Sequence, residues 1–137
     1  MTTINTDIYD ALMSGVNAAV TGIRIAWEND GFTPNLPVPF CRASVLPRTV
    51  EPASLGLDGY NEHQGTVLLD FHYPVGTGPA VVLAKIDEVL SILKRGVVVT
   101  SGTAQVRLES VWRVPPVYGK AWVQFPVQIR WRCHAVS

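Results

Sequence analysis

The sequence has few charged residues, no excess of either charge and no long apolar run. Only 16% of its 137 residues are charged, against about 25% in a typical soluble domain, and 11 basic residues balance 11 acidic ones. A balanced charge gives no net field to attract nucleic acid or an anionic membrane. No apolar stretch approaches the roughly 20 residues of a membrane-spanning helix. So little charge favours a surface hidden in an assembly, with an uncharged compact monomer as the alternative.

Cysteine is equally scarce. Cys41 and Cys133 are the only two, and they lie far apart without the spacing of a metal or redox motif. Residues 1–10 lack the basic and apolar regions of a secretory signal, which favours a protein that starts in a cytoplasm. We therefore expect two reduced thiols. The length favours a single domain over residues 1–137.

The central stretch, residues 65–96, changes from a strand pattern to a helix pattern. A period of two predicts a half-buried strand, with a core face made of Val67, Leu69, Phe71 and Tyr73. Pro74 stops strand pairing because it has no N–H to donate. Glycines follow at positions 76 and 78, and Pro79 suits the first turn of a helix that runs toward Gly96.

The remaining patterns fill out one sheet. Helical spacing predicts a first helix over 4–20, and alternation predicts strands over 23–28, 38–46, 97–100, 104–114 and 121–133. Pro126 predicts that the last strand lies at a sheet edge or carries a bulge. Turn-forming residues predict a long loop over 47–64, with a mobile segment at 51–64.

This order of elements predicts an α+β fold, a single mainly antiparallel sheet with two helices packed on one face. The residues expected in its core are Trp27, Leu69, Phe71, Ile86, Leu90, Trp112, Phe125 and Ile129.

No pattern in the sequence indicates catalysis. The glycines at 76 and 78 follow a strand and open a helix, but Val81 stands where a dinucleotide motif needs a third glycine. Asp70 and His72 share a strand face and could act as an acid–base pair or as two metal ligands, although a solvated face is the simpler interpretation. We therefore expect no catalytic residue, no cofactor and no metal site.

Arginines gather near the end of the chain. If the last two strands pair, Arg107, Arg113, Arg130 and Arg132 share one sheet face with Glu109. Such a face could contact an acidic protein surface or remain an ordinary solvent face. It lacks interleaved aromatic residues, which disfavours nucleic-acid readout.

Three pieces of the chain, taken in order, resemble the tail terminator (tail completion) proteins of long-tailed bacteriophages. The first is the N-terminal helix followed by Trp27, Glu28 and Asn29, then Phe32 and Pro34. The second is the strand with Pro74, Gly76 and Gly78 that leads into a helix with Ile86 and Asp87. The third is the closing strand pair with its tryptophans. Together these pieces cover most of the chain.

The resemblance implies an α+β structural protein of the virion, not an enzyme, assembled in the host bacterial cytoplasm. Such proteins form a ring, commonly of six subunits, at the head-proximal end of the tail tube. Its partners would be further copies of itself, the tail tube protein and a head-neck connector. It would contact no membrane and no specific nucleic-acid sequence, although the genome would pass through the ring. The alternatives are another neck or minor tail protein, or a small ligand-binding or hydrolytic domain using residues 76–78.

The ring needs lateral contacts between subunits, and a sheet edge offers unpaired backbone groups for them. With the strand of residues 121–133 at an edge, Arg130 and Arg132 could meet carboxylates such as Asp7 or Glu62 of the neighbouring subunit. The candidate interface residues are Asp7, Glu62, Arg107, Arg113, Arg130 and Arg132.

Overall fold

The computed structural model describes residues 4–28, 34, 38–52, 61–102 and 104–135. These residues form helices α1 (Ile4–Ala19) and α2 (Pro79–Ile92). The strands are β1 (Arg24–Trp27), β2 (Phe40–Pro52), β3 (Asn61–Pro74), β4 (Val98–Ser101), β5 (Ala104–Arg113), β6 (Val117–Tyr118) and β7 (Trp122–Ala135).

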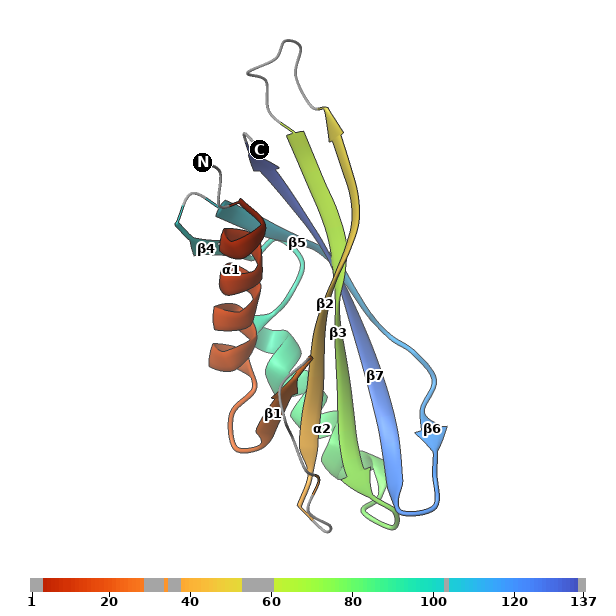
Figure 1. Cartoon of the computed structure of the whole chain (residues 1–137). Coiled ribbons are helices and arrows are strands. Elements are labelled where there is room, and N and C mark those ends of the chain that lie inside the picture. Colours follow the sequence, from red (N-terminus) through yellow and green to blue (C-terminus); the bar gives the residue numbers. More distant parts are fainter. Residues whose placement is uncertain (1–3, 29–33, 35–37, 53–60, 103, 136–137) are drawn as a thin grey trace.

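The strands form one curled sheet, in the order β1-β2-β3-β7-β5-β4, with the short β6 beside β7. Every strand pair is antiparallel except β1 with β2. The long strands β2, β3 and β7 run the length of the molecule (Figure 1), and α1 packs over β4 and β5 and beside α2. Both helices share one hydrophobic core with the sheet, which confirms the α+β fold.

The core forms where the sequence periods predict it. Helix α1 buries six side chains at helical spacing, namely Ile4, Ile8, Ala11, Leu12, Val16 and Ala19. Strand β3 buries every second residue from Val67 to Tyr73 in the same core. Pro79 occupies the first turn of α2, but the helix ends at Ile92. Lys94 and Arg95 therefore lie beyond its last turn, although the sequence predicts a helix that runs toward Gly96.

Strand β7 is a central strand, so its expected edge position is wrong. It pairs with β3 on one side and with β5 and β6 on the other. Val114 N donates to Pro126 O over 3.0 Å. In an antiparallel sheet the N–H and C=O of one residue point to the same neighbour. The N–H that Pro126 lacks would therefore face the connection between β5 and β6, where no ladder bond is lost.

A bulge in β5 moves Trp112 out of the core. The register with β7 shifts between Leu108 and Ser110, so one additional residue fits into β5 there. Beyond the bulge the faces of the strand exchange. Val111 then packs against the core, and Trp112 is 39% exposed. Of the other expected core residues, Leu90 is half-buried and the rest are buried.

The expected loop over 47–64 is mostly strand at its two ends. Strand β2 continues through a bulge between Pro47 and Thr49 to Pro52, and β3 already begins at Asn61. Residues 53–60, the rest of the expected mobile segment, lie outside the described residues. The two proline residues did not stop β2, because at this end of the strand only β3 pairs with it in the described structure.

Both cysteine side chains are buried free thiols, as expected. Burial raises the pKa of the Cys41 and Cys133 thiols, and the Asp70 carboxylate adds to the effect at Cys41. Both thiols therefore stay protonated and unreactive at neutral pH. No helix of the described chain is long and apolar enough to cross a membrane.

Candidate subunit interface

Three of the four candidate arginines lie on the sheet face that points away from the helices. Arg107 of β5 is the register partner of Arg132 of β7, and Arg130 lies opposite Ser110. The alternation of β7 explains this arrangement, because its other face buries Ile129, Trp131 and Cys133. The pairing of the last two long strands therefore gathers cations as predicted.

Arg113 does not belong to this group, which corrects the expected set of four. It lies beyond the β5 bulge and opposite Val127, a core-facing residue. The bulge that exposes Trp112 thus also moves Arg113 to the helix side of the sheet. Its side chain is exposed there.

Arg132 has two acidic partners within its own chain. Its Nε lies 2.6 Å from Glu109 Oε1 and 3.2 Å from Glu62 Oε1. The bulge places Glu109 beside Arg132, and β3 carries Glu62 to its other side. The sequence suggested a carboxylate of a neighbouring subunit as a partner of Arg132, and within its own chain two carboxylates lie beside it.

Glu62 is also held by two other side chains. Gln64 Nε2 donates to Glu62 Oε1, and His134 Nε2 lies 3.0 Å from Glu62 Oε2. Hydrogen bonds from Gln64 and His134, with the charge of Arg132, lower the pKa of the Glu62 carboxyl. Glu62 is therefore ionised at neutral pH. The sequence alone did not predict the contact with His134, since 72 residues separate the pair.

Arg132 and His134 border a shallow hollow of about 400 Å³ on the outer sheet face. Its lining includes Arg107, Arg132, Glu109 and His134. The lining holds two arginines and one carboxylate, so the surface offers charges of both signs to a partner.

Asp7 is not near the arginines. It lies in the first turn of α1, on the helix side of the sheet, where its carboxylate faces the turn at Gly102 between β4 and β5. The arginines of the outer face therefore cannot reach Asp7 of the same chain. An ion pair between Asp7 and these arginines therefore requires two different subunits.

Asp70 and His72 lie two residues apart on β3. No cluster of three potential metal ligands occurs among the described residues. His72 is buried, not solvated as expected, because its ring stacks on Phe40 with centroids 4.5 Å apart. Burial lowers the pKa of His72, and its Nδ1 lies 3.1 Å from the Asp70 carbonyl oxygen. This arrangement is that of a packed, neutral imidazole.

The glycine segment at 76–78 turns the chain. Gly76 and Gly78 adopt φ values of 95° and 87°, which favour glycine. The Thr77 hydroxyl donates to the Pro74 carbonyl over 2.7 Å, so it is already engaged. The adjoining pocket is mostly apolar, and no lysine or arginine lines it in the described structure. These features do not suit a phosphate site.

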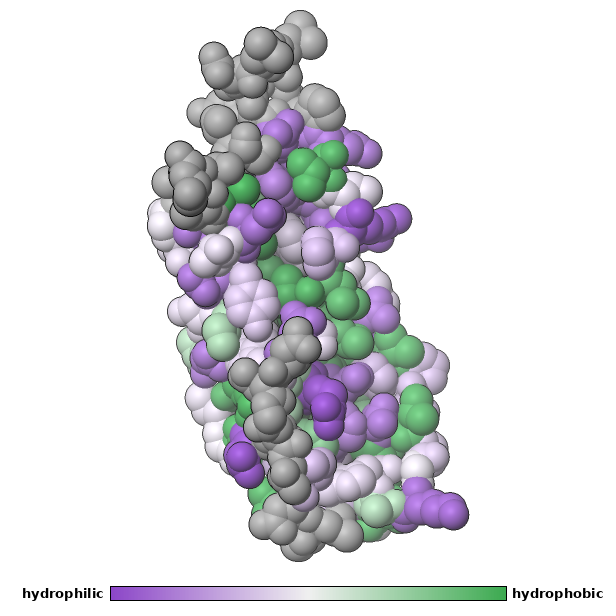
Figure 2. All heavy atoms as spheres, viewed as in Figure 1, coloured by the Kyte–Doolittle hydropathy of each residue, from purple (hydrophilic) through white to green (hydrophobic). Residues whose placement is uncertain are grey.

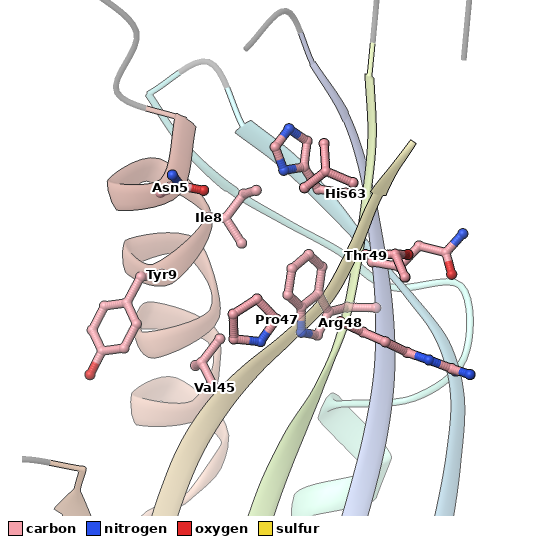
Figure 3. Close-up of a pocket in the computed structure, with 11 residues that line it drawn as sticks. Asn5, Ile8, Tyr9, Val45, Pro47, Arg48, Thr49 and His63 are labelled. Atoms are coloured by element: carbon pink, nitrogen blue, oxygen red, sulfur yellow. The ribbon is translucent and has the colours of Figure 1, made fainter. Parts of the chain in front are cut away.

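A cavity of about 350 Å³, which no sequence pattern predicted, lies between α1 and β2. Its walls include Ile8 from α1, Val45 and Pro47 from β2, and His63 from β3, with Trp131 of β7 also in the lining. Figure 3 shows the His63 ring and Ile8 pointing into the space between helix and strands. We name it the α1–β2 cavity. The available signal was Gly65, because a glycine inside a strand often marks a close approach.

The fold and this surface define a small α+β protein whose one sheet face is buried by helices and whose other face carries paired charges. A family model described as phage tail terminator protein matches residues 7–131. The chain therefore belongs to the phage tail terminator family.

Solved structures share the fold. One is 21% identical with a TM-score of 0.73, and the match covers 98% of this chain and 95% of the other. A second, from the virion of a native gene transfer agent particle, is 16% identical with a TM-score of 0.60, covering 98% and 100% of the two chains. A search of curated proteins finds no significant match.

Proposed function

We propose that this protein forms a closed ring that caps the head-proximal end of the tail tube. The ring ends tube polymerisation and offers the surface to which the head-neck connector joins. The observation that carries the proposal is the family match over residues 7–131. A structural role in the phage tail follows from that family membership.

A closed ring suits the task of ending a tube. A tube grows because each added layer presents the same acceptor surface again, which is a heterologous, open-ended contact. A terminator must match that surface on one side and differ from it on the other. Cyclic symmetry uses up the lateral surfaces of each copy, so growth can continue only through the two ring faces. Helices on one sheet face and charges on the other give each copy two dissimilar faces.

Arg107 and Arg130 are the candidate interface residues of the outer face whose side chains are exposed. Glu62 and Arg132 form an ion pair within the chain, and Arg132 lines the hollow. Asp7 and Arg113 remain candidates on the helix side.

Two experiments test the proposal. Electron microscopy and native mass of the purified protein should reveal a closed ring. Removal of the protein during phage assembly should give overlong tails of irregular length without attached heads. Tails of normal length joined to heads in its absence would contradict the termination role.

A further inference from the structure

Two buried nitrogen atoms at the α1–β2 cavity have no hydrogen-bond partner in the described structure. His63 is 5% exposed and Trp131 is 2% exposed. The unpartnered atoms are His63 Nε2 and Trp131 Nε1. Buried polar atoms are almost always hydrogen-bonded in native proteins, because an unmade bond destabilises the fold. These two atoms therefore indicate that something else supplies the bonds.

The lining determines which chemistry fits. The Trp131 indole N–H can only donate. Burial lowers the pKa of His63, so its imidazole is neutral and one of its ring nitrogens accepts. Ile8, Val45 and Pro47 give much of the wall an apolar surface, and Arg48 is the charged residue among the described lining, which holds no carboxylate. A phenol suits these walls with its ring, and its hydroxyl both accepts and donates.

The cavity lies beside a free side of β2. Strand β1 pairs with β2 only as far as Ala43, and no other described strand pairs with that side beyond it. Leu46 and Val50 are 47% and 57% exposed there. Figure 2, in the view of Figure 1, shows hydrophobic residues at the molecular surface among hydrophilic ones.

Strand addition is disfavoured on this free side of β2. Pro47 has no N–H to donate, and the bulge between Pro47 and Thr49 interrupts the regular edge. A partner can therefore bind here by inserting a side chain more readily than by adding a strand.

The same chain exposes a phenol at the opposite end of its sheet. Tyr118 of β6 is 75% exposed, and Val75 and Val117 beside it are 52% and 54% exposed. Tyr118 pairs with Val123, which precedes Trp131 by eight positions along β7. At roughly 3.3 Å per residue this separates the two places by about 26 Å. A chain therefore cannot fill its own cavity with Tyr118.

We propose that the α1–β2 cavity receives the Tyr118 side chain of a second copy of this chain. The phenol ring packs on the apolar walls, and its hydroxyl bonds to the unpartnered nitrogen atoms. The contact joins two different surfaces, so it is heterologous, which is the kind of contact that closes a ring. The inference rests on the proposed ring and names two surfaces that hold it together.

Mixed cross-linking tests this contact in the full-length protein. Copies carrying Tyr118→Cys are mixed with affinity-tagged copies carrying Val50→Cys, which lines the cavity, and are then mildly oxidised. We expect a disulfide between the two kinds of copy. The matched control pairs Ile92→Cys on α2 with Val50→Cys, because Ile92 is 46% exposed but lies outside both surfaces. Each single variant alone controls for the buried native thiols.

Assembly of point variants provides a second readout. Tyr118→Ala should raise the dissociation constant of the ring about tenfold or more, the effect of removing an aromatic anchor, and Tyr118→Phe should have a smaller effect. Tyr118 is mostly exposed, so both variants should fold. The proposed contact is overturned if the wild-type protein forms a ring, the mixed disulfide does not form and Tyr118→Ala assembles like wild type. The ring proposal would still stand in that case. A wild-type protein that never assembles overturns both.

Discussion

Gly65 of β3 and Trp131 of β7 are register partners that approach so closely that a β-carbon at residue 65 would overlap the indole ring. It would also lie 2.5 Å from the carbonyl oxygen of Leu46 on β2. Only glycine leaves room for the tryptophan between these strands. This contact fixes the indole that lines the α1–β2 cavity.

Gly65→Ala should therefore lower the free energy of unfolding by about 1–3 kcal/mol or more, the usual effect of overpacking. The added methyl group would meet the backbone of β2, which cannot move aside as a flexible side chain can. Chemical denaturation followed by far-UV circular dichroism measures the change. Thr66→Ala is the matched control, since Thr66 is the next residue of β3 and points to the half-buried outer face. Equal midpoints for both variants would show that the strands separate at no cost.

The β5 bulge predicts opposite outcomes for two aromatic residues. Phe71 is fully buried, so Phe71→Ala should lower the free energy of unfolding by about 3–5 kcal/mol. Trp112 is 39% exposed, and Trp112→Ala should lower it by much less. Denaturant titration of the two variants gives the comparison. Similar large losses would mean that Trp112 lies in the core after all.

The regular parts of the fold were predictable because local periods determine them. The stripe of α1 and the alternation of β3 survive in the structure because each element buries one face. Trp112 was misplaced because one additional residue in β5 exchanges its faces, and no local signal marks that bulge. Pro126 was misread because its tolerance depends on which strand lies beside it.

The candidate site was predictable to a smaller extent. Alternation alone placed Arg107, Arg130 and Arg132 on one face. Their partners could not be predicted, because Glu62 reaches Arg132 only through the β3–β7 pairing of residues far apart in sequence. The α1–β2 cavity likewise depends on how far α1 extends over the sheet, which no periodicity records.

Burial of His63 should make stability depend on pH. The folded chain holds His63 with a pKa below its ordinary value of 6.5, because burial disfavours the charged ring. The unfolded chain therefore binds a proton first as the pH falls, and stability present above pH 6.5 is lost below it. His63→Gln should reduce the slope of unfolding free energy between pH 7 and about 5. An unchanged slope would contradict this, although buried His72 contributes a remaining slope of the same sign.

The two outer-face arginines of β7 should respond differently to charge reversal. Arg132→Glu places a third carboxylate between Glu62 and Glu109, so it should lower the stability of the isolated chain. Both ion pairs of Arg132 are lost, and repulsion among the three carboxylates adds to that loss. Arg130 is exposed and no ion pair to it occurs among the described contacts. Arg130→Glu should therefore leave the unfolding midpoint unchanged.

Measuring assembly distinguishes an arginine that stabilises the fold from one that contacts a partner. If the outer face meets a neighbouring subunit or the tail tube, Arg130→Glu should weaken that association at low salt while the fold stays intact, because exposed charges act mainly on association. Sedimentation of the variant across a salt series measures the effect, and Arg130→Lys, which keeps the charge, is its control. Association of Arg130→Glu equal to wild type at every salt concentration would remove Arg130 from the interface. The weakening should fade above roughly 0.5 M salt, where the Debye length falls toward a few ångströms.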